Sequence, residues 1–396
     1  MSGHRVRLPL RIGAVVIAGL AVLAIVSAAV WLQPDGPGDF YATPDDLGEH
    51  PPGTLLASEP LEQNLPDEID GWRVLYASTD ADDEPSAVSG MVLVPTTPFD
   101  GPRPVVAIAH GSTGVDEDCA PSLSPRPLSP LPAVQEALDA GFAVAATDYP
   151  GLGTEGPHPY LIGSASGHAV LDSVRAATQL AELDTERVAV WGFSQGGHAA
   201  LFAAELAPTY AAELELSGVV AFAPAADLAE IVRSSQGTVF GTLIVVQATV
   251  AWSEARDDLD LEAVIDPASV ARARELADRC LDPTSLPAAV LQSTLLIDDI
   301  TPLDDPAAAA WAPFLEQNTP SGDLDVPLLV FQGAEDPIIR PAMTRRFAEA
   351  SCAAGAAVDL RIVPGVGHFT LSRRTAADAV AWTAERFAGA EPQTTC

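Results

Sequence analysis

A serine between two glycines lies where an apolar run meets a segment rich in small residues. In Gly192-Phe-Ser194-Gln-Gly196 the Gly-x-Ser-x-Gly pattern directly follows the apolar residues Val188–Trp191. A turn this tight admits only small residues on either side of the serine and lifts the serine hydroxyl clear of the sheet. The order of strand, serine and helix therefore predicts a nucleophile elbow, in which Ser194 attacks a carbonyl group.

A serine nucleophile needs a base that takes its proton and an acid that orients the base. In this type of fold the acid and the base follow the serine in the order Asp or Glu, then His. The predicted base is His368, in a glycine-containing loop after an apolar strand, and the predicted acid is Asp336, directly after another such strand. Glu335, Asp298 and Asp299 are alternative acids. The remaining histidines are not assigned the role of base: His4, His50, His110, His158, His168 and His198.

The negative charge that develops on a carbonyl oxygen under attack requires two preorganised N–H donors. One is predicted to be the backbone N–H of Gln195, which follows the nucleophile. The second is predicted to come from the glycine-containing loop 110–114, where Ser112 and Thr113 are the candidates and their hydroxyls are potential helpers. His110 is expected to brace this loop by hydrogen bonding.

Short apolar strands alternate with helices over residues 65–224 and again over 326–396, whereas residues 225–325 are helix-like and rich in loops. This alternation predicts an α/β fold, with a mostly parallel sheet covered by helices on both faces and an inserted helical cap. Strands are expected at 71–78, 88–94, 104–109, 142–147, 188–191, 216–222, 327–331 and 358–363. Helices are expected at 131–140, 165–183, 341–354 and 375–387, with a further helix directly after Ser194.

The N-terminus has the layout of an export signal. Three arginines precede the apolar run Ile12–Leu32, and acidic residues begin at Asp35. The run has the flanks of a signal peptide and a length that spans a bilayer. Residues 1–32 are therefore predicted to be a signal peptide or a membrane anchor, with a buried helix as the third alternative. Residues 33–64, rich in Pro, Gly and acids, are expected to form a linker and an irregular N-terminal arm.

Charge and cysteine content limit the partners and the compartment. The net charge of −34 and the absence of lysine oppose binding to phosphate backbones, so no nucleic acid is expected as a partner. The histidines show no ligand spacing with cysteines or carboxylates, so no metal site is predicted. The cysteines are even in number and lack metal or redox spacing, which in an exported chain predicts two disulfides. The spacing alone leaves three possible pairings. The alternative is unpaired buried thiols at Cys119, Cys280, Cys352 and Cys396.

Three motifs together resemble the secretory lipase family of α/β-hydrolases, which includes yeast lipase A-type enzymes and actinobacterial secreted relatives. They are the elbow at Ser194, the loop His110-Gly-Ser-Thr-Gly-Val and the run Thr147-Asp-Tyr-Pro-Gly-Leu-Gly-Thr-Glu-Gly-Pro-His-Pro-Tyr-Leu. The resemblance covers Leu55 to Phe387, and residues 148–160 are its most family-specific part. It implies an α/β-hydrolase fold whose cap acts as lid and acyl-binding surface.

The same resemblance implies hydrolysis of triacylglycerol or other carboxylic esters without a metal or organic cofactor. It further implies that Cys119 pairs with the cap cysteine Cys280, which leaves Cys352 to pair with Cys396. Apolar residues of the cap then predict a tunnel or groove for an acyl group, and the alternative is that they form the cap's own core. These residues are Val239, Phe240, Leu243, Ile244, Val245 and Val246.

The predicted function is that of an exported serine carboxylic ester hydrolase, a lipase or esterase that works through an acyl-enzyme. Its substrate would be a small-molecule or lipid ester, met outside the cell or at the outer face of the membrane. The same scaffold also supports a peptidase or an acyltransferase. The acidic run Ser253–Glu262 in the cap supports the peptidase alternative, because such enzymes often bind a substrate amine through carboxylates. A non-catalytic envelope binding protein is the alternative from another class.

Overall fold

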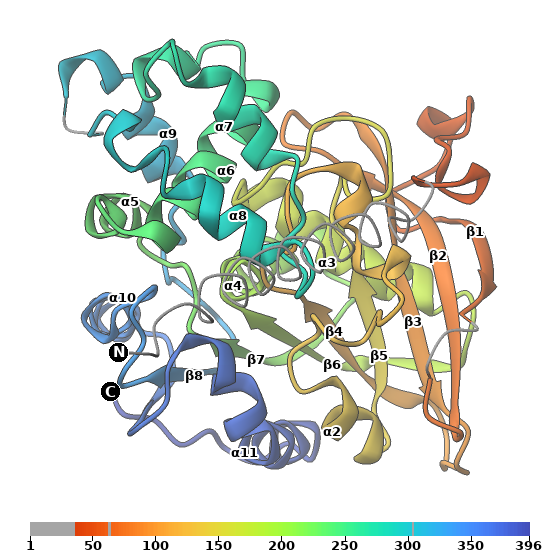
Figure 1. Ribbon diagram of the computed structural model, residues 1–396. Helices are drawn as coiled ribbons and strands as arrows, with labels where there is room; N and C mark the ends of the chain where they lie inside the picture. Colours follow the sequence, from red (N-terminus) through yellow and green to blue (C-terminus); the bar gives the residue numbers. More distant parts are fainter. Residues whose placement is uncertain (1–35, 62–64, 303–304) are drawn as a thin grey trace, which may run out of the picture. The chain divides into compact units, whose positions relative to one another are not determined.

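The computed structural model describes residues 36–61, 65–302 and 305–396, and these form a nine-stranded sheet in the order β1-β2-β3-β5-β4-β6-β7-β8-β9 (Figure 1). The pairs β1–β2, β2–β3 and β3–β5 are antiparallel, and the remaining pairs are parallel. The predicted mostly parallel sheet is thus confirmed. The strands are β1 (Leu55–Pro60), β2 (Ile69–Thr79), β3 (Pro85–Pro95), β4 (Arg103–Ala109), β5 (Ala143–Thr147), β6 (Leu183–Phe193), β7 (Leu216–Phe222), β8 (Leu328–Gly333) and β9 (Val358–Val363).

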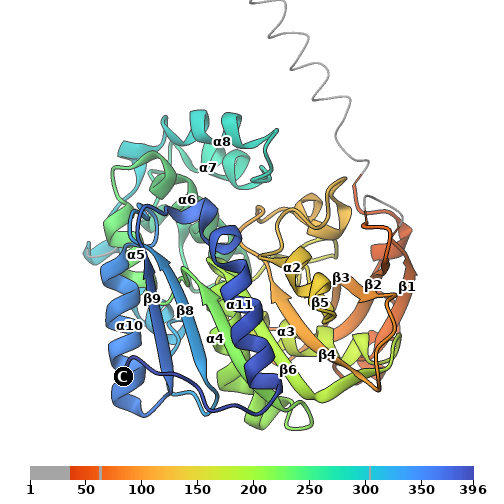
Figure 2. The same cartoon turned by 90° about the horizontal axis from the view of Figure 1, so that it is seen from below.

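Helices cover both faces of the sheet and enclose two apolar cores. In the central strand β4 every residue is buried, as expected for a parallel strand packed on both sides. Val106 and Ile108 belong to the core that includes α2 (Val134–Asp139) and α11 (Leu371–Phe387). The alternate residues of β4 belong to the other core, with α3 (Gly163–Ala177), α4 (Gln195–Tyr210) and part of α10 (Pro341–Ala354). Figure 2 shows β8 and β9 between α10 and α11.

A helical insertion separates β7 from β8 and lies together at one end of the sheet (Figure 1). Aromatic rings pack together within it: the Trp252 ring lies 6.1 Å from Trp311 and 5.2 Å from Phe314, centroid to centroid. The chain returns to the sheet through Asn318, whose side-chain oxygen accepts the Gly163 N–H at 2.9 Å. The helices are α5 (Leu228–Ser235), α6 (Val239–Ala255), α7 (Val270–Ala277), α8 (Leu286–Ser293) and α9 (Trp311–Gln317).

The prediction of an irregular arm over residues 33–64 is wrong for Leu55–Pro60, which forms the edge strand β1. None of its six residues is buried, and the strand ends in proline, so it lacks the apolar alternation of an internal strand. Its strand conformation depends on hydrogen bonding to β2, a partner that local sequence does not reveal.

Element boundaries also differ from the prediction around residues 178–187. The helix α3 ends at Ala177 instead of continuing to 183, and β6 begins at Leu183, five residues before the predicted start. The first part of β6 is polar, and it is held as a strand by pairing with the start of β4, where Leu183 is opposite Arg103. The helix α10 and the strand β9, in contrast, have the predicted bounds.

The predicted signal peptide or anchor, residues 1–32, lies outside the described residues. Among the residues that are described, no helix combines the length and the apolar character needed to cross a bilayer.

The structure contains both disulfides that the family resemblance implied. Cys119, in the loop after β4, is bonded to Cys280, between α7 and α8 of the insertion. Cys352 of α10 is bonded to Cys396 at the C-terminus. The terminal residues also follow the edge of β9, where the Thr395 N–H donates to the Val358 carbonyl at 2.8 Å.

The second disulfide closes a loop whose ends are 44 residues apart in sequence. A cross-link of this length removes conformational entropy from the unfolded chain, and its loss typically costs about 2–4 kcal/mol. We therefore expect Cys352→Ser combined with Cys396→Ser to lower the free energy of unfolding in urea by about this amount. An unchanged urea midpoint would contradict the prediction.

Candidate active site

The nucleophile elbow is built by steric constraint. Ser194 connects β6 to α4 with φ 57° and ψ −113°, a backbone conformation that side-chain-bearing residues rarely adopt. A Cβ on Gly192 would lie 1.9 Å from the Gly196 carbonyl oxygen, and a Cβ on Gly196 would lie 1.9 Å from the Ala109 carbonyl oxygen. The Ser194 N–H donates to the Phe222 carbonyl of β7 at 2.9 Å. Only glycine fits both flanking positions, as the motif predicts.

Ser194, His368 and Asp336 form one hydrogen-bonded chain. The Ser194 hydroxyl lies 3.0 Å from His368 Nε2, and His368 Nδ1 lies 2.7 Å from Asp336 Oδ2. Because an ionised carboxylate only accepts hydrogen bonds, Nδ1 carries the proton and Nε2 is left to accept the serine O–H. The His368 side chain is 4% exposed and the Asp336 side chain 0%. The structure thus places the three predicted residues in contact and largely shields His368 and Asp336 from water.

Asp336 is fixed by hydrogen bonds from its own loop. Its Oδ1 atom accepts the N–H groups of Ile338 and Ile339, each at 2.9 Å. The buried Gln332 of β8 donates from Nε2 to the Ile339 carbonyl at 2.9 Å and lies 3.4 Å from Asp336 Oδ2. These contacts hold one carboxylate oxygen and leave the other directed at the imidazole.

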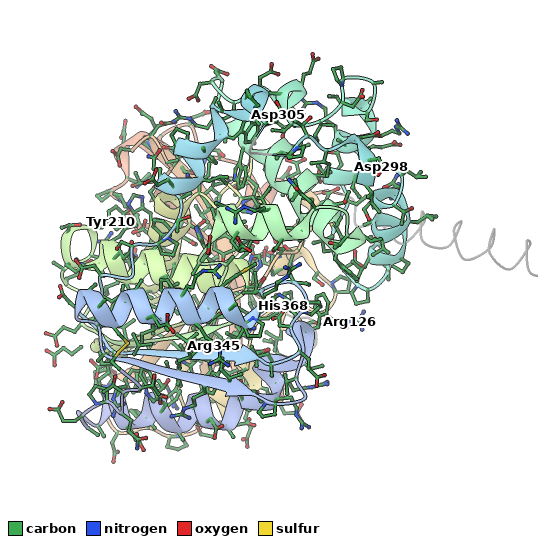
Figure 3. All side chains as sticks on the ribbon, turned by 90° about the vertical axis from the view of Figure 1, so that its left-hand side faces the viewer. Arg126, Tyr210, Asp298, Asp305, Arg345 and His368 are labelled. Atoms are coloured by element: carbon green, nitrogen blue, oxygen red, sulfur yellow. A yellow bond between two sulfur atoms is a disulfide. The ribbon has the colours of Figure 1, made fainter. Side chains whose placement is uncertain are left out.

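The alternative acids do not contact His368. Glu335 is exposed, and its backbone N–H donates to the Val366 carbonyl at 3.0 Å, which joins the acid loop to the base loop. In Figure 3, His368 lies beside α10 where the core meets the insertion, and Asp298 lies apart from it within the insertion. Asp299 accepts a hydrogen bond from the Ser269 hydroxyl at 2.5 Å instead.

The candidate oxyanion groups come from the start of α4 and from the loop after β4. Gln195 is the first residue of α4, so its N–H has no carbonyl partner within the helix. Gln195 and Ser112 line the same pocket as the nucleophile. The Thr113 hydroxyl is buried without a hydrogen-bond partner among the described residues, and the Thr113 carbonyl accepts the Leu281 N–H of the insertion at 2.7 Å.

An apolar cavity of about 100 Å³ lies over the nucleophile. Phe240, Leu243 and Ile244 of α6 line it, and Leu243 also belongs to the buried core cluster that contains Val246, so the apolar residues of this helix serve both predicted roles. Phe240 and Phe369, 39% and 66% exposed, both line the cavity, with their ring centroids 6.0 Å apart. The other lining residues are Ser112, Tyr160, Leu161, Phe193, Ser194, Gln195, Ala225, Ile231, Leu281, Leu286, Ile338, Ile339 and His368.

His158 belongs to the site region although sequence reasoning gave it no role. Its ring is buried, and burial lowers its pKa to about 3, so the imidazole is neutral. Nδ1 donates to the Pro150 carbonyl at 2.8 Å, which leaves Nε2 to accept the side-chain N–H of Gln195 at 3.1 Å. The residue after the nucleophile is thereby held in place. The available signal was the position of His158 within the family-specific run 148–160.

Asp148, from the same run, has a structural role beneath the site. Its carboxylate accepts the Ser89 hydroxyl at 2.7 Å, the Ser122 N–H at 3.1 Å and also the Ser122 hydroxyl. Burial raises the pKa of Asp148 to about 6. His110 Nε2 lies 3.2 Å from the Asp148 carbonyl, and burial lowers the pKa of His110 to about 4. A neutral, hydrogen-bonded His110 agrees with the expected bracing of loop 110–114.

The sheet order, the elbow after β6 and the helical insertion before β8 define the class of this protein as an α/β-hydrolase fold. Residues 131–395 match the sequence profile of the secretory lipase family, and the chain belongs to that family. Both the fold and the family that the sequence motifs suggested are confirmed.

Individual relatives agree with this placement. A probable inactive lipase of Mycobacterium tuberculosis is 27% identical over 376 residues, which cover 88% of this chain and 82% of that protein. Lipase 6 of Candida albicans is 28% identical over 286 residues, which cover 66% of this chain and 60% of the length of that lipase. Among solved structures, Candida antarctica lipase A has the same fold, with a TM-score of 0.77 at 22% identity over 92% of this chain and 89% of that chain.

Asp148 gives the stability of the protein a defined pH dependence. Its folded pKa of about 6 lies above the unfolded value of about 3.9, so the folded state binds more protons between these values. The stability that Asp148 contributes is therefore greatest below pH 4, falls as the pH rises to about 6, and is constant above that. The Asp148→Asn variant lacks this titration and is the reference. Between pH 4 and 6 the free energy of unfolding of the wild type should fall by up to about 3 kcal/mol relative to that of the variant. Urea unfolding of both proteins from pH 4 to 8 measures it, and a pH-independent difference would contradict it.

Proposed function

We propose that this chain is an exported serine carboxylic ester hydrolase that works through an acyl-enzyme. The observation that carries the proposal is the hydrogen-bonded chain from Ser194 through His368 to Asp336. Ser194 and His368 of this chain line an apolar pocket. The family name, secretory lipase, and the lipases among its relatives support the same class of reaction.

In the first half of the proposed reaction, His368 Nε2 takes the hydroxyl proton as Ser194 Oγ attacks the ester carbonyl carbon. Asp336 stabilises the imidazolium that forms. The carbonyl oxygen becomes an oxyanion, which receives hydrogen bonds from the Gln195 N–H and from one N–H of Ser112 or Thr113. The tetrahedral intermediate then breaks the ester C–O bond, and His368 passes its proton to the departing alcohol.

In the second half, water attacks the acyl-enzyme, and His368 again removes the proton. The collapse of the second tetrahedral intermediate releases the carboxylic acid and returns the proton to Ser194. No cofactor enters either half, because the base, the acid and the oxyanion donors all come from the chain.

The substrate is proposed to be a small-molecule or lipid ester with an apolar acyl group. The pocket is lined by aliphatic and aromatic side chains, and the described residues that line it include no carboxylate. This favours an ester over a peptide whose amine would need an acidic partner. The cavity of about 100 Å³ is smaller than the 300–1,000 Å³ typical of ligand sites, so long acyl chains require the Phe240–Phe369 contact to open.

The proposed place of action is outside the cytoplasm. The basic flank and apolar run of residues 1–32 provide export, as a cleaved signal or as an anchor. Two disulfides fit an oxidising compartment. The catalytic groups then belong to a core of residues 65–224 and 326–396, and residues 225–325 form the cap over the pocket.

The experiment that tests the proposed function is hydrolysis of p-nitrophenyl esters with two to sixteen acyl carbons. Ser194→Ala should reduce the rate to background, and Asp336→Asn should lower kcat by about 10³–10⁴ because the imidazole adopts the wrong tautomer. Glu335→Gln, a change of the exposed neighbouring carboxylate, is the matched control and should retain the wild-type rate.

A wild type that hydrolyses none of these esters would contradict the proposal and favour a peptidase or a non-catalytic binding protein; one relative is a probable inactive lipase. Equal losses in Asp336→Asn and Glu335→Gln would contradict the assignment of the acid. Formation of a new ester from added alcohol would identify the acyltransferase alternative.

A second prediction concerns acyl chain length. Phe240→Ala should raise kcat/KM for twelve-carbon esters relative to four-carbon esters by about tenfold, the effect of a few methylenes gaining apolar contact. Phe99→Ala is the control, because this phenylalanine is 42% exposed and packs against Arg103 outside the pocket. If both variants keep the wild-type chain-length ratio, the aromatic pair does not limit access.

A further inference from the structure

Two hydroxyls, those of Ser112 and Tyr160, meet in the wall of the catalytic pocket. Ser112 Oγ and the Tyr160 phenol oxygen lie 2.6 Å apart, and both residues line the pocket together with Ser194. Tyr160 is 1% exposed, so its phenol has little access to water. Ser112 belongs to the loop after β4, from which the second oxyanion N–H is predicted to come.

The pair has one hydroxyl hydrogen that the bond between the two residues does not use. Each hydroxyl carries one hydrogen, and the 2.6 Å bond uses one of the two. Neither oxygen has another hydrogen-bond partner among the described residues, so the second hydrogen has no acceptor within the protein. Ser112 is only partly buried, so a hydroxyl hydrogen on it can reach an acceptor on a ligand in the pocket.

The phenol is the better donor of the two groups, because it is the stronger acid. Burial raises the pKa of Tyr160 to about 12, so the phenol keeps its proton throughout the working range of the enzyme. We therefore assign Tyr160 as the donor to Ser112 Oγ, an assignment that leaves the Ser112 hydrogen free to turn toward the pocket.

Tyr160 is itself held on more than one side. Its carbonyl accepts the indole N–H of Trp252, from α6 of the insertion, at 2.5 Å. Its ring meets the neutral His158 ring edge-on at a centroid distance of 5.9 Å. The next residue, Leu161, has a φ of 56°, a left-handed conformation that fixes the course of the backbone. The phenol is thus preorganised before any substrate binds.

We propose that the Ser112 hydroxyl is a third hydrogen-bond donor to the oxyanion and that Tyr160 is the positioning residue that directs it. The inference rests on the proposed function, since it concerns the same reaction. The oxyanion carries more charge in the transition state than the ester carbonyl does in the ground state. The donor therefore acts mainly on kcat and little on KM.

The experiment compares Tyr160→Phe, Ser112→Ala, Ser112→Thr and the double variant Tyr160→Phe with Ser112→Ala, on a p-nitrophenyl ester that the wild type hydrolyses. Loss of one oxyanion donor costs about 10²–10³ in rate, so Ser112→Ala should lower kcat by about 10²-fold. Tyr160→Phe should lower it by about tenfold, because the serine hydroxyl remains but is no longer directed. The double variant should equal Ser112→Ala, and Ser112→Thr, which keeps a hydroxyl, should stay close to wild type.

An alkyl boronic acid gives a second readout, because its serine adduct places an oxygen where the oxyanion forms. Its inhibition constant should rise in proportion to the loss of kcat/KM in each variant, while KM changes by no more than about threefold. Tyr76→Phe is the matched control. It deletes a fully buried phenol that donates to the Thr147 hydroxyl at 2.7 Å, and it should lower stability while kcat stays unchanged.

Effects of Tyr160→Phe and Ser112→Ala that multiply in the double variant would overturn the inference, as would a wild-type kcat in Ser112→Ala. If Tyr160→Phe fails to fold, the Ser112→Ala and Ser112→Thr pair decides, since equal kcat values in these two would show that the hydroxyl does not matter. A wild type without esterase activity would instead overturn the proposed function, so the two failures are distinguishable.

Discussion

The tight turn at Ser194 is the constraint on which the rest of the site depends. A positive φ on a residue with a side chain costs about 1–3 kcal/mol, and it persists only because the surroundings fix it. Here the carbonyl oxygens of Gly196 and Ala109 occupy the space that side chains at the two glycines would need. The start of α4, which carries Gly196, must therefore lie close against the end of β4, and this brings the loop that carries Ser112 beside Ser194.

Parallel strands bring the remaining groups to the same edge of the sheet, and the insertion fixes their positions. Asp336 follows β8 and His368 follows β9, so both lie beyond the carboxyl ends of neighbouring strands. The insertion reaches the loop after β4 through the Cys119–Cys280 bond and through a hydrogen bond from Leu281 to Thr113. The insertion, which contributes residues to the pocket lining, is thus covalently joined to the loop that carries Ser112 and Thr113.

Local sequence was sufficient to predict a feature wherever that feature depended on a single strand and the loop that follows it. The mostly parallel sheet, the elbow, and the positions of His368 and Asp336 after apolar strands could all be predicted in this way. The edge strand β1 could not, because its six residues gain their strand conformation only from pairing with β2. His158 and Tyr160 were missed for a similar reason, since their contacts with Gln195 and Ser112 span 37 and 48 residues and leave no periodic trace.

The measurement that tests the central claim most directly is labelling with a fluorophosphonate probe, followed by peptide mapping. Such probes react with a serine whose hydroxyl is activated by a neighbouring base. The contact between Ser194 and His368 predicts one probe per chain, located on Ser194 and absent from Ser194→Ala. A folded wild type that takes up no probe, or takes it up at another serine, would contradict the account.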